Sequence, residues 1–311
     1  MLVEDLTLIK ILPYGDSNFD LYLSSKIGDN RKFTTKVVEK SALRTNFNKA
    51  INNEISILLD TNHPNILKFY EIKENDNKIF IVEEYFYESL ECFFERNKIK
   101  YISEESVQYI MRQIVDAIKY LHNKKIIHRN LNLENIAISY DDENNKINNN
   151  IMKAKIKIIN FTSARYLNKG EMAYIELGSP LYMEPSILFK LRGIPEYKDK
   201  GYDEKADIWS IGIIFYQLLT GKMPFEADDM QELVEKTEKG NYYVPTAISK
   251  EAFSFLNCML QFDPKKRTSI DILYNHDFLR KDVNNFKKIN ENIHLDKIKV
   301  NIYKNNELLT E

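Results

Sequence analysis

Two short polar stretches carry the residues that could do chemistry, HRNLNLEN at 128–135 and NFT at 160–162. Asn130 in the first stretch has nearly the shape of an aspartate, but its amide cannot accept a proton at neutral pH. The amide oxygens of Asn135 and Asn160 can touch Mg²⁺, yet they bring no negative charge to a hard cation that favours carboxylate and phosphate oxygens. The amides in these two stretches therefore lack the charge that would favour either proton transfer or the binding of a hard cation.

The chain up to about residue 85 has the pattern of strands. β-Branched or alternating runs predict strands at 6–12, 19–25, 32–38, 66–72 and 78–85. One helix is expected among them at 46–60, with Ile51, Ile55 and Leu58 on one face. This part of the chain is therefore predicted to be a small β-rich lobe with one main helix.

From about residue 90 the pattern becomes helical. The segment 103–124 opens with Ser103 ahead of glutamates in its first turn, which is typical of a helix start. Two strand-like runs at 135–139 and 155–159 flank an Asn-rich, solvated insertion at 141–153. Further helices are predicted at 205–220, 228–239, 248–261 and 269–280. The fold class is therefore predicted to be α+β, with a ligand-binding cleft between a β-rich and a larger helical lobe.

The composition argues against several classes of function. A formal net charge of −2 offers no electrostatic footprint for nucleic acid or an anionic membrane. Cys92 and Cys258 are the only cysteines, so we expect no disulfide framework and a reducing compartment. The first residues do not read as a signal peptide, and the apolar stretch at 208–219 is too short to span a bilayer. We expect an intracellular protein of the cytoplasm or nucleus.

The motifs, in their order and spacing, resemble those of the protein kinase superfamily, of the Ser/Thr type. FTTK at 33–36 is similar to the strand that carries the nucleotide lysine, and Glu54 to the glutamate that pairs with this lysine. HRNLNLEN and NFT are similar to H-R-D-L-x-x-x-N and D-F-G, with Asn in place of both Asp residues. Three later signatures are GSPLYMEPS at 178–186, ADIWSIGIIFYQLLTGKMPF at 206–225 and DPKKR at 263–267.

The resemblance implies a bilobal kinase-like domain at 5–280. Its N-lobe would span 5–85, its hinge 84–90 and its C-lobe 90–280, followed by a C-terminal tail at 281–311. Within the superfamily, the region after residue 200 is similar to the Unc-51-like kinases and to the calcium/calmodulin-dependent group. In the tail, Ile298, Val300 and Ile302 alternate, and a paired strand and disorder both stay open.

The resemblance also implies a set of nucleotide-binding residues. Lys36, oriented by Glu54, would face the phosphates, although the same pair could be purely architectural. Thr34 and Ala137 would enclose adenine, and the backbone of Glu84 and Phe86 would bond it. The whole expected set is Gly15, Thr34, Lys36, Glu54, Glu84, Phe86, Asn135, Ala137 and Asn160. The loop at 11–23 has Gly15 as its one glycine, which is poor for cradling phosphates.

Against the same pattern no catalytic group is intact. Asn130 stands at the position of the base and Asn132 at that of a cationic lysine. Asn135 and Asn160 are the two metal positions, so Mg²⁺ binding should be weak or absent. Glu83 falls at the gatekeeper position, where a carboxylate must be paired, with Lys36 as the candidate partner, unless a shift of one residue leaves it at the surface.

Three structural expectations accompany these losses. Asp207 would cap the backbone of the catalytic loop. Arg267, whose partner in the family is a glutamate at the position of Ser186, would pair with Glu184 instead. The segment between Ser163 and Ser179 contains no Ser or Thr, so a fixed conformation is simpler than control by phosphorylation.

Three functions stay open. The leading one is a pseudokinase that acts as a scaffold or allosteric partner of other proteins, such as an active kinase or its substrate, and binds either ATP without Mg²⁺ or no nucleotide. The second is a weakly active Ser/Thr protein kinase that transfers the γ-phosphate of ATP to protein. The third is an engineered, inactive variant of such an enzyme, with Asp→Asn at positions 130 and 160.

Overall fold

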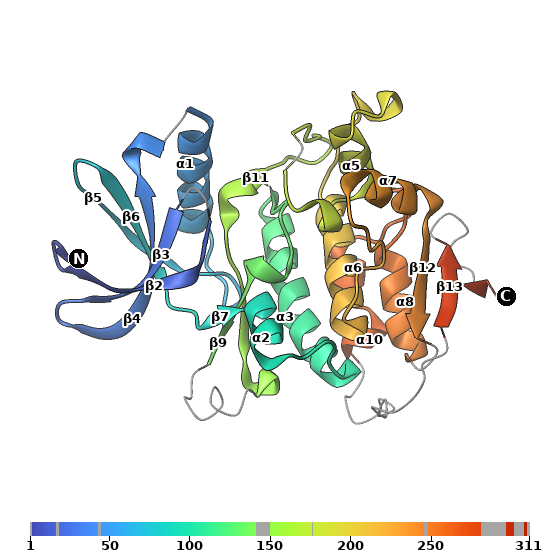
Figure 1. Cartoon of the computed structure of the whole chain (residues 1–311), viewed down its shortest axis with the longest axis horizontal. Coiled ribbons are helices and arrows are strands. Elements are labelled where there is room, and N and C mark those ends of the chain that lie inside the picture. The colour runs from blue at the N-terminus through green and yellow to red at the C-terminus, as the bar shows by residue number, and fades with distance from the viewer. Residues whose placement is uncertain are drawn as a thin grey trace. The chain divides into compact units, whose positions relative to one another are not determined.

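The computed structural model describes residues 2–16, 19–42, 45–140, 150–175, 177–245, 248–280, 297–301 and 308–309. Most of the predicted insertion at 141–153 and most of the predicted tail lie outside these residues. The chain divides into two compact units. The first unit is Met1–Phe93 with Leu133–Arg165, and the second is Phe94–Asn132 with Tyr166–Glu311. Figure 1 shows the elements of both.

The first unit contains a six-stranded antiparallel sheet in the order β1-β2-β3-β4-β6-β5. Its strands are β1 (Leu2–Val3), β2 (Leu6–Asp16), β3 (Phe19–Lys26), β4 (Asp29–Glu39), β5 (Phe69–Glu74) and β6 (Lys78–Glu84). The strand predicted at 66–72 begins later, because Ile66 forms an isolated bridge to Ile158 instead. Gly28, with φ of +79°, closes the turn between β3 and β4, where a left-handed backbone favours glycine.

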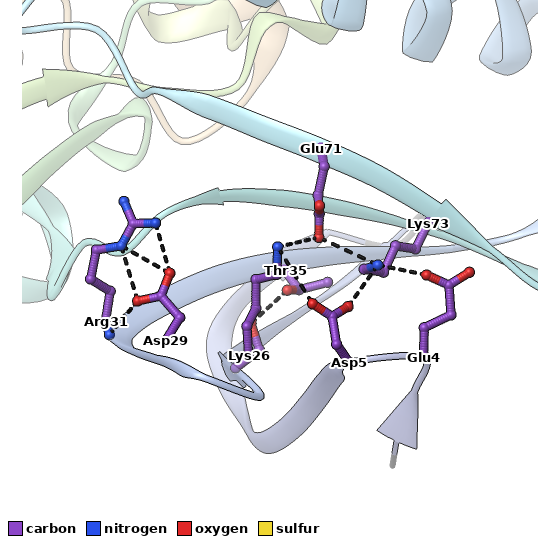
Figure 2. A network of polar contacts seen from close by, with 9 residues as sticks. Glu4, Asp5, Lys26, Asp29, Arg31, Thr35, Glu71 and Lys73 are labelled. Carbon is purple, nitrogen blue, oxygen red and sulfur yellow. Dashed lines mark hydrogen bonds and ion pairs between the residues drawn. The ribbon is translucent and has the colours of Figure 1, made fainter.

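The sheet curls until its two ends meet. Lys73 on β5, the last strand, lies 2.6 Å from Glu4 and 2.7 Å from Asp5, which connect β1 to β2 at the opposite end (Figure 2). Lys26 on β3 reaches Glu71 on β5 at 2.9 Å in the same network. The hydrogen bond from Lys73 is the main reason that the pKa of Asp5 lies below its usual value. Ion pairs therefore link the two ends of the curled sheet.

One face of this sheet packs against α1 (Thr45–Asp60) (Figure 1). Because side chains alternate along strands, Val38 and Ile81 face Ile51 of α1 in one buried cluster. Phe33, Phe80 and their neighbours on the other face form a second buried cluster. The helix predicted at 46–60 is therefore confirmed, and it covers the face that also carries Lys36.

A smaller sheet completes the first unit, in the order β10-β9-β7. It is built from β7 (Glu88–Ser89), β9 (Ile136–Ser139) and β10 (Lys155–Ile158). Two single-turn 3-10 helices flank it, η2 (Leu133–Asn135) and η4 (Phe161–Ser163), and a third, η3 (Ile151–Lys153), precedes β10. Since η2 leads into β9 and η4 follows β10, this sheet places Asn135 and Asn160 near one another.

The second unit is mainly helical. After α2 (Leu90–Asn97), which crosses the boundary between the units, its helices are α3 (Glu104–Asn123), α5 (Pro185–Leu191), α6 (Lys205–Thr220), α7 (Met230–Lys239), α8 (Lys250–Met259), α9 (Ile270–Tyr274) and α10 (Asp277–Arg280). Ser103 caps α3, where its hydroxyl accepts from Ser106 N. Phe215 of α6 lies 5.0 Å from Phe255 and 5.1 Å from Phe278 between ring centroids, so three helices share an aromatic core.

Two expectations for the helical part need correction. The single helix predicted at 269–280 is interrupted, because Asn275 ends α9 and the His276 ring accepts the Phe278 N–H at the start of α10. Neither α2 nor α5 is predicted by the periodicity. Among the described residues, no helix is long and apolar enough to cross a membrane.

Part of the predicted tail adds two strands to the second unit. β12 (Asn241–Pro245) pairs with β13 (Lys297–Asn301), which pairs with β14 (Leu308–Leu309). Val300 lies opposite Tyr242, and both are buried. The alternation of Ile298 and Val300 therefore marks a strand that docks on its own chain, while Ile302 lies outside the described residues.

Candidate functional site

Lys36 and Glu54 form the centre of the site in the first unit. Lys36 Nζ lies 2.7 Å and 2.8 Å from the two carboxylate oxygens of Glu54, and both side chains are almost completely buried. Glu54 Oε1 also accepts a hydrogen bond of 3.0 Å from Phe161 N. The pair therefore connects β4, α1 and η4, and the carboxylate is held by a cation and a backbone donor together.

The strand register gathers the neighbours of Lys36 on one face of the sheet. Leu21 of β3 and Ile81 of β6 lie opposite Lys36, and Glu83 lies opposite Thr34. Because the side-chain period along a strand is two, Thr34 and Lys36 share the face that α1 covers. The Thr34 hydroxyl is buried and finds no hydrogen-bond partner within the part of the chain that the structure describes. Such an oxygen is suited to accept a donor from a bound molecule.

Glu83 is buried, so the alternative of a surface position is wrong. Burial raises the pKa of its carboxyl to about 7. The positive charge of Lys36 lowers this pKa and the negative charge of Glu54 raises it, so the three groups share one electrostatic neighbourhood. The charge of Lys36 thus acts on two buried carboxyls, although its direct ion pair is with Glu54.

Asn135 and Asn160 bind each other. Asn160 Nδ2 donates to Asn135 Oδ1 at 3.1 Å, and Thr162 Oγ1 donates to Asn160 Oδ1 at 2.6 Å. Asn160 has a φ of +62°, a left-handed conformation that Asn tolerates better than most residues. Thr162 lies within the 3-10 helix η4, so the turn does not need the glycine of the family pattern at this position.

This amide pair does not fit a Mg²⁺ ion. Both amide oxygens already accept hydrogen bonds from protein donors, and neither residue carries a negative charge. A hard divalent cation would compete with these hydrogen bonds and would find only neutral amide ligands in this pair. Within the described residues, no group of three or more His, Cys, Asp or Glu side chains is placed to hold a metal ion.

The segment expected to bond adenine lies at the end of β6. Glu84 N donates to Lys68 O at 2.8 Å, and its carboxylate lies 2.8 Å from Lys157 Nζ. Phe86 and Ala137 are buried in the cluster that also contains Ile81. Gly15, the remaining expected residue, falls in β2 close to the end of its hairpin with β3.

Phe19, at the start of β3, is a residue that the sequence reasoning did not single out. Lys36 Nζ lies 4.5 Å from the centroid of its ring, within the range of a cation–π contact. The predicted strand at 19–25 begins with this phenylalanine, inside the loop where the family pattern has glycines. An aromatic residue at such a position was the available signal.

Asn130 and Asn132 lie in the second unit, where Ser179 connects them. Ser179 N donates to Asn130 Oδ1 at 3.2 Å, and Asn132 Nδ2 donates to Ser179 Oγ at 3.0 Å. Gly178 has a φ of +115°, and a Cβ there would stand 2.6 Å from Arg129 O. The segment that begins at Gly178 is therefore packed tightly onto the loop, with the Asn130 oxygen used as an acceptor.

The expected cap on this loop is confirmed. Asp207 accepts hydrogen bonds of 2.9 Å from His128 N, Arg129 N and the His122 ring. These donors and the nearby imidazoles hold the pKa of the buried Asp207 carboxyl below its usual value, against the effect of burial. The loop therefore keeps its architecture although its acidic residue is absent from position 130.

Two further contacts order the second unit. Arg267 Nη1 lies 2.5 Å from Glu184 Oε2, with both side chains buried, so Glu184 does take the place of the family's glutamate as its partner. Ser186 Oγ donates to the other oxygen of the same carboxylate. Arg129 Nη1 donates to the Tyr202 hydroxyl at 3.3 Å, and this hydroxyl donates to Ile175 O at 2.6 Å. The arginine is thus engaged by a tyrosine.

Comparisons with known proteins agree with this architecture. The model of the protein kinase domain matches residues 19–279. Over 251 residues the chain is 30% identical to a probable serine/threonine-protein kinase, MARK-A, of Dictyostelium discoideum, covering 80% of this chain and 22% of that protein. Over 281 residues it is 29% identical to an Aurora kinase of the same organism, covering 90% of this chain and 67% of that protein. The chain belongs to the protein kinase family.

Proposed function

We propose that this chain is a pseudokinase, a protein kinase domain without competent phosphoryl transfer that acts as a scaffold or allosteric partner of other proteins. The observation that carries the proposal is the Asn160–Asn135 hydrogen bond at 3.1 Å. It engages the side chains at the two expected metal positions with each other, and neither side chain offers a charged ligand to Mg²⁺. Any nucleotide at Lys36 is therefore taken without Mg²⁺.

Metal loss bears directly on the reaction. Phosphoryl transfer depends almost entirely on positioning and on neutralising the charge of the phosphates, and in protein kinases Mg²⁺ does most of the latter. With an uncharged side chain at position 160, the protein repels a triphosphate less, but it does not neutralise the charge that develops during transfer. Of the charged groups that the family pattern places beside the phosphates, Lys36 is present, and its charge is already shared with Glu54.

The base position supports the same proposal. Asn130 Oδ1 accepts from Ser179 N, and an amide cannot take the proton of a substrate hydroxyl at neutral pH. Asn132 donates to Ser179 and brings no cation toward a phosphate. The second unit therefore offers architecture for binding a protein rather than groups for chemistry.

The remaining assignments are part of the proposal. We assign the kinase-like domain to 5–280 and the tail to 281–311, and we place the protein inside the cell. The nucleotide set keeps the residues named from the sequence. The partner is another protein, and a subfamily near the Unc-51-like or calcium/calmodulin-dependent kinases is retained.

Thermal stability with ATP tests the metal claim. We expect any rise in melting temperature with ATP to be the same in Mg²⁺ and in EDTA. A rise that requires Mg²⁺ would contradict the proposal. The variant Asn160→Asp should make any ATP-induced rise larger in Mg²⁺ than in EDTA, because it restores a carboxylate, whereas the exposed control Asn168→Asp should not.

A second candidate is a weakly active Ser/Thr protein kinase. It is favoured by the intact Lys36–Glu54 pair, which orients the nucleotide lysine in active family members. Loss of the base would then be tolerated because the hydroxyl proton moves late in a loose transition state. Transfer of phosphate to a generic protein substrate that Lys36→Ala abolishes would establish this candidate. Activity that appears only in Asn130→Asp/Asn160→Asp would instead point to an inactivated enzyme.

A further inference from the structure

Phe19 covers Lys36, the residue of the first unit that the family pattern places beside the phosphates. Its ring centroid lies 4.5 Å from Lys36 Nζ, and the side chain is only 9% exposed. Phosphate oxygens bind an ammonium group at about 2.8 Å in charge-assisted hydrogen bonds. The ring therefore blocks one side of the ammonium group, and a phosphate could bind on that side only by displacing the ring.

The other neighbours of Lys36 already balance its positive charge. Glu54 contributes two oxygens, at 2.7 Å and 2.8 Å. Glu83 adds a second buried carboxyl on the same face of the sheet. The negative face of an aromatic ring stabilises a cation without adding net charge. Phe19 therefore contributes to a Lys36 environment that is satisfied without a ligand.

The same phenylalanine is continuous with the apolar residues expected around adenine. Phe19, Leu21, Phe86 and Ala137 belong to one buried cluster, in which Ala137 is fully buried. Thr34, expected on the other side of the base, is also fully buried, with its hydroxyl lacking a partner among the described residues. The residues expected to line a nucleotide site are thus buried in the protein, and the Thr34 hydroxyl among them lacks a hydrogen-bond partner within the described residues.

We propose that the Phe19 ring takes the place of a bound phosphate beside Lys36, so that the chain keeps its nucleotide site closed with its own side chain, and that removing this ring admits a nucleoside triphosphate. This inference rests on the proposed function, in which any nucleotide that reaches the Lys36 site binds there without Mg²⁺.

The test is titration of the purified full chain with a fluorescent N-methylanthraniloyl derivative of ATP in EDTA. Phe19→Ala should bind this nucleotide at least tenfold more tightly than the unmodified chain. The matched control is Phe33→Ala, which removes a ring that is 1% exposed, against 9% for Phe19, from the opposite face of the same sheet and should change the affinity less than twofold. Adding Lys36→Ala to Phe19→Ala should abolish the gain.

The proposal is overturned by equal affinities of Phe19→Ala and the unmodified chain, by absence of binding in both, by the same gain in Phe33→Ala, or by a gain that survives Lys36→Ala. Phe19→Leu, which keeps an apolar side chain in the cluster, replaces Phe19→Ala if the latter does not fold. It should still bind at least threefold more tightly, and affinity equal to that of the unmodified chain overturns the proposal.

Failure of this inference differs visibly from failure of the proposed function. The pseudokinase proposal fails if the unmodified chain transfers phosphate in a Lys36-dependent manner, whatever the affinities. The present inference predicts that Phe19→Ala gains nucleotide binding and still transfers no phosphate, because Asn130 and Asn160 are unchanged.

Discussion

Lys36 and Glu54 form a two-pronged ion pair with side chains that are 4% and 1% exposed. The same carboxylate accepts the Phe161 N–H at 3.0 Å, directly after Asn160. The pair therefore joins the sheet, its covering helix and the degenerate metal segment in one unit. A structural role therefore explains why this ion pair is present beside Asn160, and so does a role in nucleotide binding.

Breaking this pair from one side should be costly. Lys36→Met leaves the Glu54 carboxylate buried without its cation, and we expect the free energy of unfolding to fall by about 3–5 kcal/mol. Lys36→Met/Glu54→Leu should lose less than the sum of the two single variants, since no unpaired charge remains. Urea unfolding of the four proteins gives the coupling energy. Additive losses would show that the pair contributes no stability of its own.

Glu83 should make stability depend on pH. Its folded pKa of about 7 lies above the ordinary 4.5 because of burial, so between these values the folded state binds more protons than the unfolded one. The stability from this group is therefore complete below about pH 4.5 and is lost as the pH rises to 7, by up to about 3 kcal/mol. Lys36 limits the loss, since it favours the charged form, and Glu54 opposes it.

Glu83→Gln should remove this dependence. We expect its melting temperature, relative to that of the unmodified chain, to increase from pH 5 to pH 8. Melting curves of both proteins at four pH values check this result. A constant difference across the range would mean that Glu83 stays ionised in the folded protein.

The parts of the fold that depend on a repeating local pattern could be predicted, whereas several contacts between single side chains could not. Alternation along β3, β4 and β6 and the apolar face of α1 follow from the sequence because they repeat over several residues. The break between α9 and α10 depends on one histidine ring that caps a backbone N–H, which periodicity does not detect. The same holds for the edge-to-edge contact of Lys73 with Glu4 and Asp5.

The site shows the same division. The family pattern placed Lys36 opposite Glu54 and identified Asn135 and Asn160 as the metal positions. It did not indicate that these two amides bind each other, since a side-chain hydrogen bond between residues 25 positions apart leaves no spacing signal. Phe19 was missed because an apolar residue at the start of a strand is usually just part of the core.

Glu184 should be essential to the stability of the second unit. It forms a fully buried ion pair with Arg267, and Glu184→Ala leaves the guanidinium unpaired, which should cost about 3–5 kcal/mol. Glu184→Ala/Ser186→Glu returns a carboxylate to the position that the family pattern uses, two residues away, and should regain part of the loss. Urea denaturation compares the variants. If the double variant is no more stable than Glu184→Ala, position 186 cannot reach Arg267 in this chain.

The Tyr202 hydroxyl should order the segment 166–178, which precedes Ser179. Its hydroxyl links Arg129 to Ile175 O, and burial raises its pKa, so the hydroxyl stays protonated at neutral pH. Tyr202→Phe removes both hydrogen bonds, at a cost of about 1 kcal/mol. We expect faster amide exchange and faster proteolysis within 166–178. Tyr197→Phe, on a half-buried ring in the same unit, serves as the control and should leave the segment unchanged. Equal exchange in all three proteins would show that Tyr202 does not order it.

We propose above that this kinase domain does not transfer phosphate. The most direct measurement is incorporation of label from γ-³²P-ATP into the purified chain and a generic protein substrate, with Mg²⁺ or Mn²⁺, beside Lys36→Ala prepared in the same way. We predict that incorporation by the unmodified chain equals that of Lys36→Ala. Incorporation that the Lys36→Ala variant eliminates would contradict the claim and make the chain an active kinase.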